Sequence, residues 1–323
     1  LIYQVADNGR LYQKYLGKKL NHDSDIQYLP QGTEAYLTHG MEDYFEPAIH
    51  IRHNDNNSSL LLKYVDHSSN AIDNGVNETV ITLKDDKYPV TVKLHYVAYG
   101  KENIIRAFSE ISHEEKKPVI LCKYASSMLH LNSSKYFLTE FSGDWAHEAN
   151  VTERELAFGK KVIDTKLGAR ANMFVSPFFQ LALDNPSQEN AGEVLVGTIG
   201  WTGNFRFTFE VDNKNELRII SGINPYDSEY SLPAKEVFRT PDFYFTYSTQ
   251  GKGEASRNFH DWARNHQVKN GNDTRMTLLN NWESTYFDFD ENKLIGLMDE
   301  ATKLGVDMFL LDDGWFANKY PRS

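Results

Sequence analysis

Three things are scarce in this sequence: cysteine, long apolar runs and positive charge. Cys122 is the only cysteine among 323 residues. A single cysteine excludes an intrachain disulfide and fits a reducing compartment, so we expect a cytoplasmic location. No apolar run approaches the roughly 20 residues that a membrane helix requires. Residues 1–19 lack the charged segment and apolar block of a signal peptide, so we expect neither a membrane span nor secretion.

The shortage of positive charge limits the partners. Lysine and arginine total 34 against 45 aspartates and glutamates, which gives a formal net charge of −11. Nucleic acids and anionic lipids are bound by clustered lysine and arginine side chains, so neither is expected as a partner. The sequence also lacks a glycine-rich phosphate loop and the G-x-S-x-G turn of serine hydrolases. It supports no Ser or Cys nucleophile and predicts no cofactor.

What the sequence has in abundance is strand pattern. From the start to about residue 250, apolar and polar residues alternate with a period of two, in short runs separated by turn residues. After a turn at residues 85–88, for example, Val92 and Leu94 fall on one strand face and Lys93 on the other. The runs are too many for one small barrel, and no helical pattern separates them. The segment predicts a large antiparallel β-sandwich.

The period changes near residue 254. Phe259, Trp262 and Ala263 recur at helical spacing, and a polar loop follows them. Residues 276–280 and 306–311 then read as two uniformly apolar strands. Strands of this kind belong to a parallel sheet buried on both faces, so the pattern indicates the opening of an α/β domain.

A helix is predicted between these two strands. Asp290 is placed to cap its first turn through the carboxylate, and Gly305 stands where a left-handed residue ends a helix. We therefore predict a β-sandwich at 1–253, a helix and linker at 254–274, and the start of a second domain at 275–323. One βαβ unit cannot close a parallel sheet or cover both of its faces. The chain is therefore expected to be cut inside its second domain.

Polar clusters follow both predicted parallel strands. Residues 280–283 read NNWE and residues 312–315 read DDGW. In parallel α/β folds, the loops at the carboxyl ends of strands converge on the ligand site. Ionised aspartates accept charge-assisted hydrogen bonds from vicinal hydroxyls, and an indole packs on the C–H face of a pyranose. The clusters favour a neutral carbohydrate as ligand.

These residue types also have other interpretations. Asp-Asp-Gly at 312–314 is also common turn chemistry with solvated carboxylates. A doubled aspartate suits a divalent cation, but no third carboxylate lies at ligand spacing, so no metal site is predicted. His50 and His53 lie three positions apart in a predicted strand and would face opposite sides of it. They are interpreted as surface or sandwich histidines and not as zinc ligands.

The most specific feature is the Trp-Glu pair at 282–283 followed by LDDGWF at 311–316. In its strand and helix context, this run closely resembles the start of the catalytic barrel in the α-galactosidases of glycoside hydrolase family 36. The upstream phrases EDYFEPAIHI, SGDWAHE and IGWTGNF resemble the N-terminal β-supersandwich of that family. The resemblance spans nearly the whole chain. It implies a β-supersandwich followed by the start of a (β/α)8 barrel.

The resemblance implies a retaining glycosidase that removes terminal α-linked galactose from oligosaccharides such as melibiose and raffinose. Asp312 and Asp313 match the aspartates that bind the galactose hydroxyls, and Trp282 matches the aromatic wall of the same subsite. Retaining chemistry needs two carboxyl groups about 5 to 5.5 Å apart, and adjacent residues leaving one strand point different ways. The family takes its nucleophile and acid/base from later strands. We expect both beyond Ser323, assign no catalytic residue here, and expect this fragment to be inactive alone.

Four more residues carry expectations from the same resemblance. The family is often tetrameric, with the N-terminal domain of one subunit reaching the active site of another, and Trp201 and Asp43 match such secondary contacts. The alternative for Trp201 is the sandwich core, and for Asp43 it is a turn. Trp315 either walls the site or packs under the barrel rim. Glu283 is expected to support the subsite by hydrogen bonding.

Two other functions remain open. The first is a non-catalytic carbohydrate-binding protein in which the β-sandwich itself holds glycan, which requires aromatic residues clustered on an exposed face of the sandwich. The second keeps the fold but transfers galactose to an acceptor, or acts on α-linked N-acetylgalactosamine. The acceptor subsite and loops from later strands decide between these reactions, and this sequence contains neither.

Overall fold

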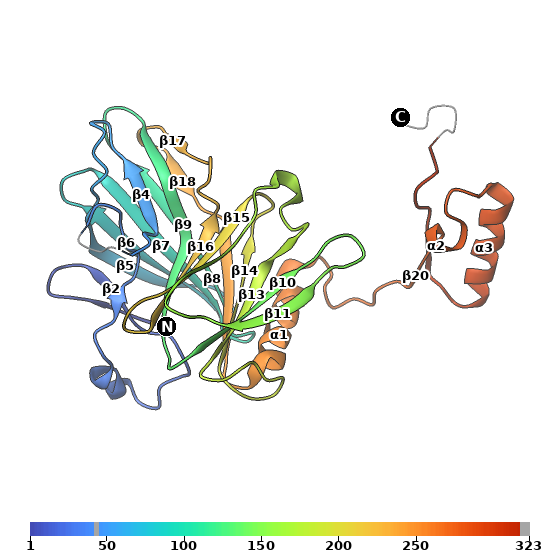
Figure 1. The fold of residues 1–323 in the computed structure, drawn as a ribbon, viewed down its shortest axis with the longest axis horizontal. Helices are drawn as coiled ribbons and strands as arrows, with labels where there is room; N and C mark the ends of the chain where they lie inside the picture. Colours follow the sequence, from blue (N-terminus) through green and yellow to red (C-terminus); the bar gives the residue numbers. More distant parts are fainter. Residues whose placement is uncertain (42–44, 317–323) are drawn as a thin grey trace. The chain divides into compact units, whose positions relative to one another are not determined.

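The computed structural model describes residues 1–41 and 45–316. It divides into two compact units, Leu1–Ala263 and Arg264–Ser323 (Figure 1). The boundary between them falls inside the segment 254–274 that the sequence predicts to be a helix and linker. Among the described residues, no helix combines the length and the apolar character needed to span a membrane.

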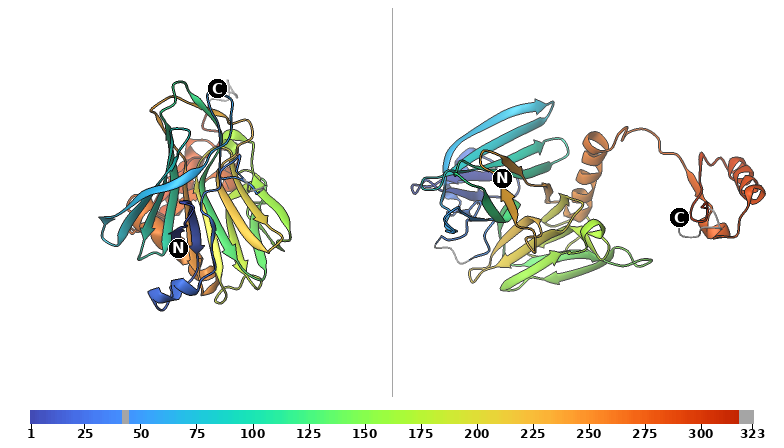
Figure 2. Two further views of the ribbon diagram at one scale, coloured as in Figure 1. Left: turned by 90° about the vertical axis from the view of Figure 1, so that its left-hand side faces the viewer. Right: turned by 90° about the horizontal axis from the view of Figure 1, so that it is seen from above.

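The first unit is built on two antiparallel sheets (Figures 1 and 2). The larger one runs in the order β11-β10-β13-β14-β19-β8-β7-β6-β5, with β18 paired to β8. Its strands are β5 (Leu62–Asp73), β6 (Val76–Asp85), β7 (Val90–Tyr99), β8 (Ile104–His113), β10 (Tyr136–Ser142), β11 (Asn150–Glu155), β13 (Val175–Leu183), β14 (Val194–Gly200), β18 (Val237–Arg239) and β19 (Asp242–Ser248).

The second sheet has the order β12-β15-β16-β9-β17, with β4 paired to β9. Its strands are β4 (Ile49–Arg52), β9 (Val119–Asn132), β12 (Gly159–Asp164), β15 (Phe205–Val211), β16 (Glu216–Ile223) and β17 (Tyr230–Leu232). A small third sheet, β1-β2-β3, comes from the start of the chain. It consists of β1 (Ile2–Val5), β2 (Leu11–Tyr15) and β3 (Thr33–Glu34), and the short 3-10 helices are η1 (Asp23–Tyr28) and η2 (Gly168–Arg170).

The hydrophobic core lies between the two large sheets, because its members come from both. Phe179 of β13 meets Phe207 and Phe209 of β15 edge-on, with ring centroids 5.2 and 4.9 Å apart, and all three side chains are fully or almost fully buried. The alternation that predicts these strands is confirmed in β7, where Val92 and Leu94 are buried and Lys93 is exposed. Alternating side chains thus give each sheet one face for the shared core.

Helix α1 (Gly251–Trp262) covers part of the opposite face of the larger sheet. Its Ala255 is buried with Val194 and Val196 of β14, whereas Leu195 between them belongs to the sandwich core. The helix begins at Gly251, whose φ is +80° and whose added Cβ would meet the Ala191 amide nitrogen at 2.6 Å. Glycine is therefore required at this start, and the helix is anchored to the sandwich. A short π-helical stretch, η3 (Ala263–Gln267), follows it.

The second unit is a βαβ element. Strands β20 (Leu278–Asn280) and β21 (Met308–Leu310) pair in parallel, and α2 (Trp282–Thr285) and α3 (Glu291–Lys303) lie between them in the chain. Asp290 caps α3 by accepting a hydrogen bond from the Lys293 amide at 2.9 Å, and Gly305 adopts a φ of 76° after the helix. Both features are as the sequence predicts. The predicted fold class, an antiparallel β-supersandwich followed by one βαβ unit of an incomplete barrel, is confirmed.

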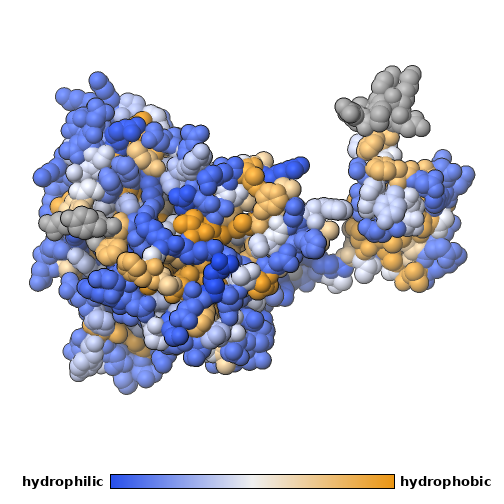
Figure 3. Space-filling model, in the orientation of Figure 1, coloured by the Kyte–Doolittle hydropathy of each residue, from blue (hydrophilic) through white to orange (hydrophobic). Residues whose placement is uncertain are grey.

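The surface of this second unit is partly apolar (Figure 3). Leu278 of β20 and Leu310 of β21 are each 47% exposed, and Leu304 after α3 is 83% exposed. Such side chains are normally covered in a parallel sheet. In the second unit, the apolar side chains of β20 and β21 are therefore only partly covered.

Candidate functional site

The two polar clusters predicted from the sequence meet at the carboxyl ends of β20 and β21. The strands pair in register, with Asn280 opposite Leu310, so residues just after each strand emerge side by side. Asn280 Nδ2 donates a hydrogen bond of 2.6 Å to Asp312 Oδ2. The parallel pairing thus joins the NNWE and DDGW segments directly, in the place where parallel α/β folds bind ligands.

The Asn281 side chain links the NNWE segment to the DDGW segment through hydrogen bonds. Its side chain is fully buried, and its Oδ1 accepts a hydrogen bond of 2.8 Å from the Asp312 backbone amide. Its Nδ2 donates to Thr285 Oγ1 at 3.0 Å, which ties the start of α2 to the same point. Asn280 and Asn281 are positioning residues to which the sequence analysis gave no role. The signal that marks them is a pair of amide side chains at the end of an apolar strand.

The Asp312 carboxylate is held in one orientation. Oδ2 accepts from Asn280 as described, and Oδ1 accepts from the Asp313 backbone amide at 2.8 Å. Within the described residues, neither Asp312 nor Asp313 forms an ion pair, and the Asp313 carboxylate accepts no hydrogen bond. Both carboxylates therefore keep lone pairs for a ligand, because a carboxylate offers about four acceptor positions.

Trp282 is the first residue of α2, directly after the two asparagines. Its backbone amide donates to Asn280 Oδ1 at 2.7 Å. Its ring is half-buried and packs edge-on against Tyr286 and Phe287, with centroids 5.3 and 5.0 Å apart. The two neighbouring rings fix the plane of the indole. The indole therefore has a set orientation at the start of α2.

Glu283 and Trp315 are both exposed. Glu283 Oε2 accepts a long hydrogen bond of 3.4 Å from the Tyr286 hydroxyl. Trp315 is 70% exposed, and its described aromatic neighbour is Phe316 at 6.0 Å, in an edge-on arrangement. Neither side chain forms a hydrogen bond with the Asp312 or Asp313 carboxylate in the described structure. In the described part of the chain, no cluster of three or more His, Cys, Asp or Glu side chains is arranged to hold a metal ion.

Two family descriptions match nearly the whole chain. "Glycosyl hydrolase family 36 N-terminal domain" matches residues 9–233, and "Melibiase" matches residues 237–322. This chain belongs to glycoside hydrolase family 36. The family resemblance in the sequence is therefore confirmed. The polar strand ends lie in the part that matches melibiase, and most of the sandwich lies in the part that matches the N-terminal domain.

The family 36 relatives of this chain are alpha-galactosidases. Alpha-galactosidase Mel36A of Lactobacillus acidophilus is 27% identical, over 98% of this chain and 48% of its own length. Alpha-galactosidase AgaA of Geobacillus stearothermophilus is 31% identical, over 81% of this chain and 35% of its own. A solved AgaA variant in complex with 1-deoxygalactonojirimycin has a TM-score of 0.90 at 26% identity, covering 98% of this chain and 49% of that one. The chain thus spans about half the length of the relatives that it matches along its whole length.

The resemblance in the sequence predicts contacts with a neighbouring subunit for Trp201 and Asp43. Asp43 lies outside the described residues. Trp201 lies in the loop between β14 and β15 and is 40% exposed, so its alternative place in the sandwich core is wrong. A Cβ at Gly203 would meet the Trp201 Nε1 at 2.8 Å. The indole therefore lies directly over Gly203, where a larger residue would displace it. The ring is available at the surface of the sandwich unit.

Proposed function

We propose that the whole protein is a retaining α-galactosidase that hydrolyses terminal α-galactosides of the raffinose and melibiose type. The curated relatives carry the name alpha-galactosidase, and solved AgaA variants are in complex with raffinose and with stachyose. In this proposal, the present chain contributes the β-supersandwich and part of the galactose subsite. The subsite consists of Asp312, Asp313 and Trp282, with Glu283 and Trp315 at its margin.

The hydrogen bond between Asn280 and Asp312 is the observation that carries this proposal. It holds Asp312 Oδ2 at 2.6 Å from Asn280 Nδ2 and leaves the carboxylate further acceptor positions that no described residue fills. A pyranose offers vicinal hydroxyls as donors to such a carboxylate and an apolar C–H face to the Trp282 indole. Asp313, next in the chain and exposed, supplies a second acceptor for the same hydroxyls.

These carboxylates bind the sugar and do not perform the chemistry in our proposal. A retaining glycosidase places a nucleophile and an acid/base about 5 to 5.5 Å apart, flanking the scissile bond. Asp312 and Asp313 leave the same strand in succession, and Oδ1 of the first already bonds the amide of the second. We propose that the catalytic pair comes from the half of the family fold that this chain does not span. The 323-residue chain alone is then inactive.

Hydrolysis of an aryl α-galactoside tests this assignment. The 323-residue chain, with its mass confirmed near 37.1 kDa, is assayed beside a longer product of the same gene. We expect turnover from the longer product alone. Turnover by the 323-residue chain itself would mean that carboxylates within it perform the chemistry, and would remove the binding-only role given to Asp312 and Asp313.

The role of the two aspartates is tested in the active longer product. Asp312→Asn or Asp313→Asn removes a charged acceptor, so kcat/KM for the galactoside should fall about tenfold to a hundredfold. Asp66→Asn, at an exposed position of β5, is the matched control and should leave kcat/KM unchanged. Equal activity of all three variants would contradict the subsite.

We propose further that the whole protein is a cytoplasmic homotetramer, and that Trp201 and Asp43 reach the active site of a neighbouring subunit. The exposure of Trp201 supports a contact of this kind. Light scattering of the longer product measures the assembly, and Trp201→Ala should raise KM without changing the mass. Galactosyl transfer and action on α-N-acetylgalactosaminides are the alternative reactions. Product analysis with raffinose plus acceptor, and comparison of the two aryl glycosides, distinguish them from hydrolysis of α-galactosides.

A further inference from the structure

The backbone reverses direction directly after α2, at Tyr286. This residue has a φ of 47° and a ψ of −128°, a conformation that a bulky aromatic residue rarely adopts and that persists only where its surroundings hold it. Its amide donates to the Trp282 carbonyl at 2.7 Å, and its carbonyl lies 3.2 Å from the hydroxyl of the buried Thr285. Hydrogen bonds at both ends of Tyr286 therefore hold a strained backbone in place.

This reversal places two rings against the Trp282 indole. Tyr286 and Phe287 both meet the indole edge-on, with interplanar angles of 81° and 87°. Edge-on packing is favourable because the positive edge of one ring faces the negative face of the other. In an extended segment, adjacent side chains point in opposite directions. The unusual backbone at Tyr286 therefore accounts for the contact of two successive rings with one indole.

Phe287 also contacts the turn that follows β21. Gly314 has a φ of 96°, and a Cβ added there would lie 3.1 Å from Phe287 Cδ1 and 3.1 Å from Phe289 Cε1. Ordinary contacts between carbon atoms are roughly 3.5 to 4.0 Å, so both rings lie directly against the glycine. Gly314 follows Asp313 in the chain. Contacts thus run from the Trp282 indole through Phe287 to the residue next to Asp313.

These ring contacts join the NNWE and DDGW segments at a second place. At the first place, Asn280 and Asn281 form hydrogen bonds with Asp312. Those bonds orient the Asp312 carboxylate and its backbone, but they do not act on the indole ring. Phe287 acts on the indole and on Gly314 together. The position of the indole relative to the aspartate turn therefore depends on Phe287.

We propose that Phe287 is a positioning residue of the galactose subsite, which fixes the Trp282 indole relative to the Asp312–Asp313 turn by packing against both the indole and Gly314. The proposal rests on the proposed function, since it takes Trp282 and the two aspartates as the groups that bind the sugar. A pyranose needs its C–H face on the indole and its hydroxyls on the carboxylates at the same time. A displaced indole therefore lowers the affinity, although Phe287 does not itself touch the sugar.

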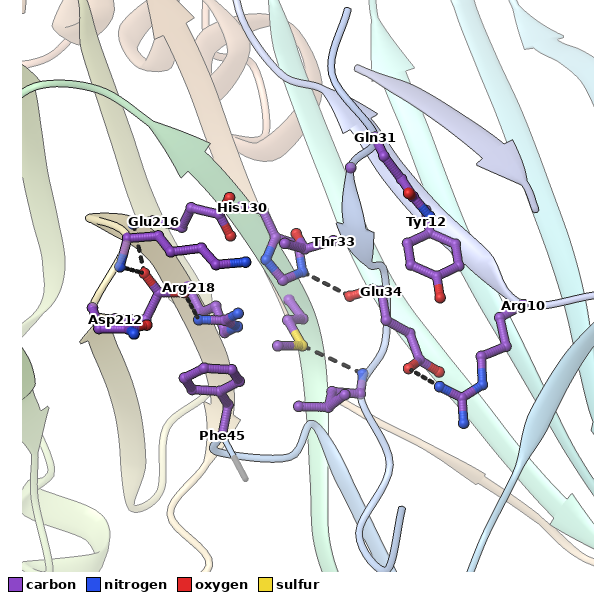
Figure 4. Close-up of a pocket in the computed structure, with 15 residues that line it drawn as sticks. Arg10, Tyr12, Gln31, Thr33, Glu34, Phe45, His130, Asp212, Glu216 and Arg218 are labelled. Carbon is purple, nitrogen blue, oxygen red and sulfur yellow. Dashed lines mark hydrogen bonds and ion pairs between the residues drawn. The ribbon is translucent and has the colours of Figure 1, made fainter. Parts of the chain in front are cut away.

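Kinetics of Phe287→Ala in the active longer product test the proposal. KM for an aryl α-galactoside should rise about twofold to tenfold, the equivalent of one aromatic pair. The value of kcat should change less, because Phe287 contacts no reacting group. Phe287→Tyr keeps the ring and should restore the parent KM. Tyr12→Ala, which removes a ring from the lining of a cavity in the sandwich unit (Figure 4), is the control and should leave KM unchanged.

A double-mutant cycle separates positioning from direct sugar contact. If Phe287 acts through the indole, Phe287→Ala should have little further effect on KM in a Trp282→Ala background, because the effects of coupled residues are not additive. Additive effects would give Phe287 a sugar contact of its own and overturn the proposal, as would equal KM values for the parent and Phe287→Ala. A longer product without any turnover would overturn the proposed function, and this inference with it.

A second readout in the 323-residue chain needs no turnover. The ¹⁵N order parameter of the Trp282 indole N–H should match that of the neighbouring backbone, and it should fall in Phe287→Ala but not in Tyr12→Ala. An indole that is equally ordered in the parent and in Phe287→Ala would contradict a positioning role. If Phe287→Ala does not fold, Phe287→Leu keeps most of the bulk without the edge-on ring, and the same rise in KM and loss of indole order are expected from it.

Discussion

Asn280 and Asp312 end two different strands and are joined by a hydrogen bond of 2.6 Å between their side chains. The bond spans the parallel pair β20 and β21 at the edge where ligands bind in such folds. It leaves the second lone pairs of the carboxylate unused, so the amide orients the acid without blocking it. The orientation of the Asp312 carboxylate therefore depends on Asn280 at the end of β20 as well as on β21.

Replacing Asn280 should weaken sugar binding indirectly, because Asn280 positions Asp312 and does not itself bind the sugar in our proposal. Asn280→Ala frees the Asp312 carboxylate to rotate, so KM for an aryl α-galactoside in the active longer product should rise about threefold to tenfold. The value of kcat should change less, because Asn280 contacts no reacting group. Asn70→Ala on exposed β5 is the control. A fall in kcat at constant KM would be inconsistent with a positioning role.

Removing the buried Asn281 side chain should loosen the second unit selectively. Asn281→Ala leaves the Asp312 amide and the Thr285 hydroxyl without their present partner, at a cost of about 1 to 3 kcal/mol each. Amide hydrogen exchange in residues 278–310 should accelerate, while exchange in the sandwich should stay the same. Uniform acceleration in both units would show that Asn281 supports more than its own unit.

The sandwich should lose stability in acid through Glu46. Burial acts to raise the pKa of Glu46, but the ammonium groups of Lys123 and Lys160 outweigh it and lower the pKa to about 2. A carboxyl whose folded pKa lies below its usual value stabilises the fold above that usual value, and the contribution is lost as pH falls toward the folded pKa. The urea midpoint should therefore decline between about pH 4.5 and pH 2.

Glu46→Gln checks this assignment. The variant should be less stable at pH 7 and should show a shallower decline of the urea midpoint over the same acid range. Glu155→Gln is the control, because Glu155 forms an exposed ion pair with Lys135, and such pairs contribute little. Identical acid slopes in the parent and in Glu46→Gln would assign the acid sensitivity to other groups.

The aromatic core between the sheets should tolerate no cavity. Phe179 is fully buried and contacts rings of β15, so Phe179→Ala should lower the free energy of unfolding by about 3 to 5 kcal/mol. Phe158→Ala removes a side chain that is 77% exposed and should change stability by less than about 0.5 kcal/mol. Urea denaturation followed by tryptophan fluorescence measures both. Similar losses would place the core elsewhere.

Local sequence patterns were enough to predict much of the fold. The alternation around Val92 and Leu94 sets the strand faces, and the Asp290 cap and Gly305 mark the ends of α3, because each depends on residues close in sequence. The position of the DDGW cluster at a strand end followed from the same patterns. The binding roles of Asp312, Asp313 and Trp282 stay predictions.

Contacts between segments far apart in the chain could not be predicted from the sequence. The brace by Asn281 depends on the register between β20 and β21, which no local pattern specifies. The exposure of Trp201 depends on how its loop leaves the sheet. The side chain of Gln13 bonds the main chain of His130, 117 positions away, and each of these residues looks ordinary in its own strand. Non-local register decides all three features.

The hydrogen bond from the Gln13 side chain to the His130 carbonyl also bears on the order in which the segments fold during synthesis. The two residues are 117 positions apart, and a ribosome adding roughly 5 to 20 residues per second needs about 6 to 23 s to cover that distance. Until β9 emerges, the N-terminal hairpin has no surface on which to dock, and closing so long a loop costs chain entropy. We expect β2, although it is made before β9, to settle only after β9 has folded, which gives a chaperone a long opportunity to act on this hairpin.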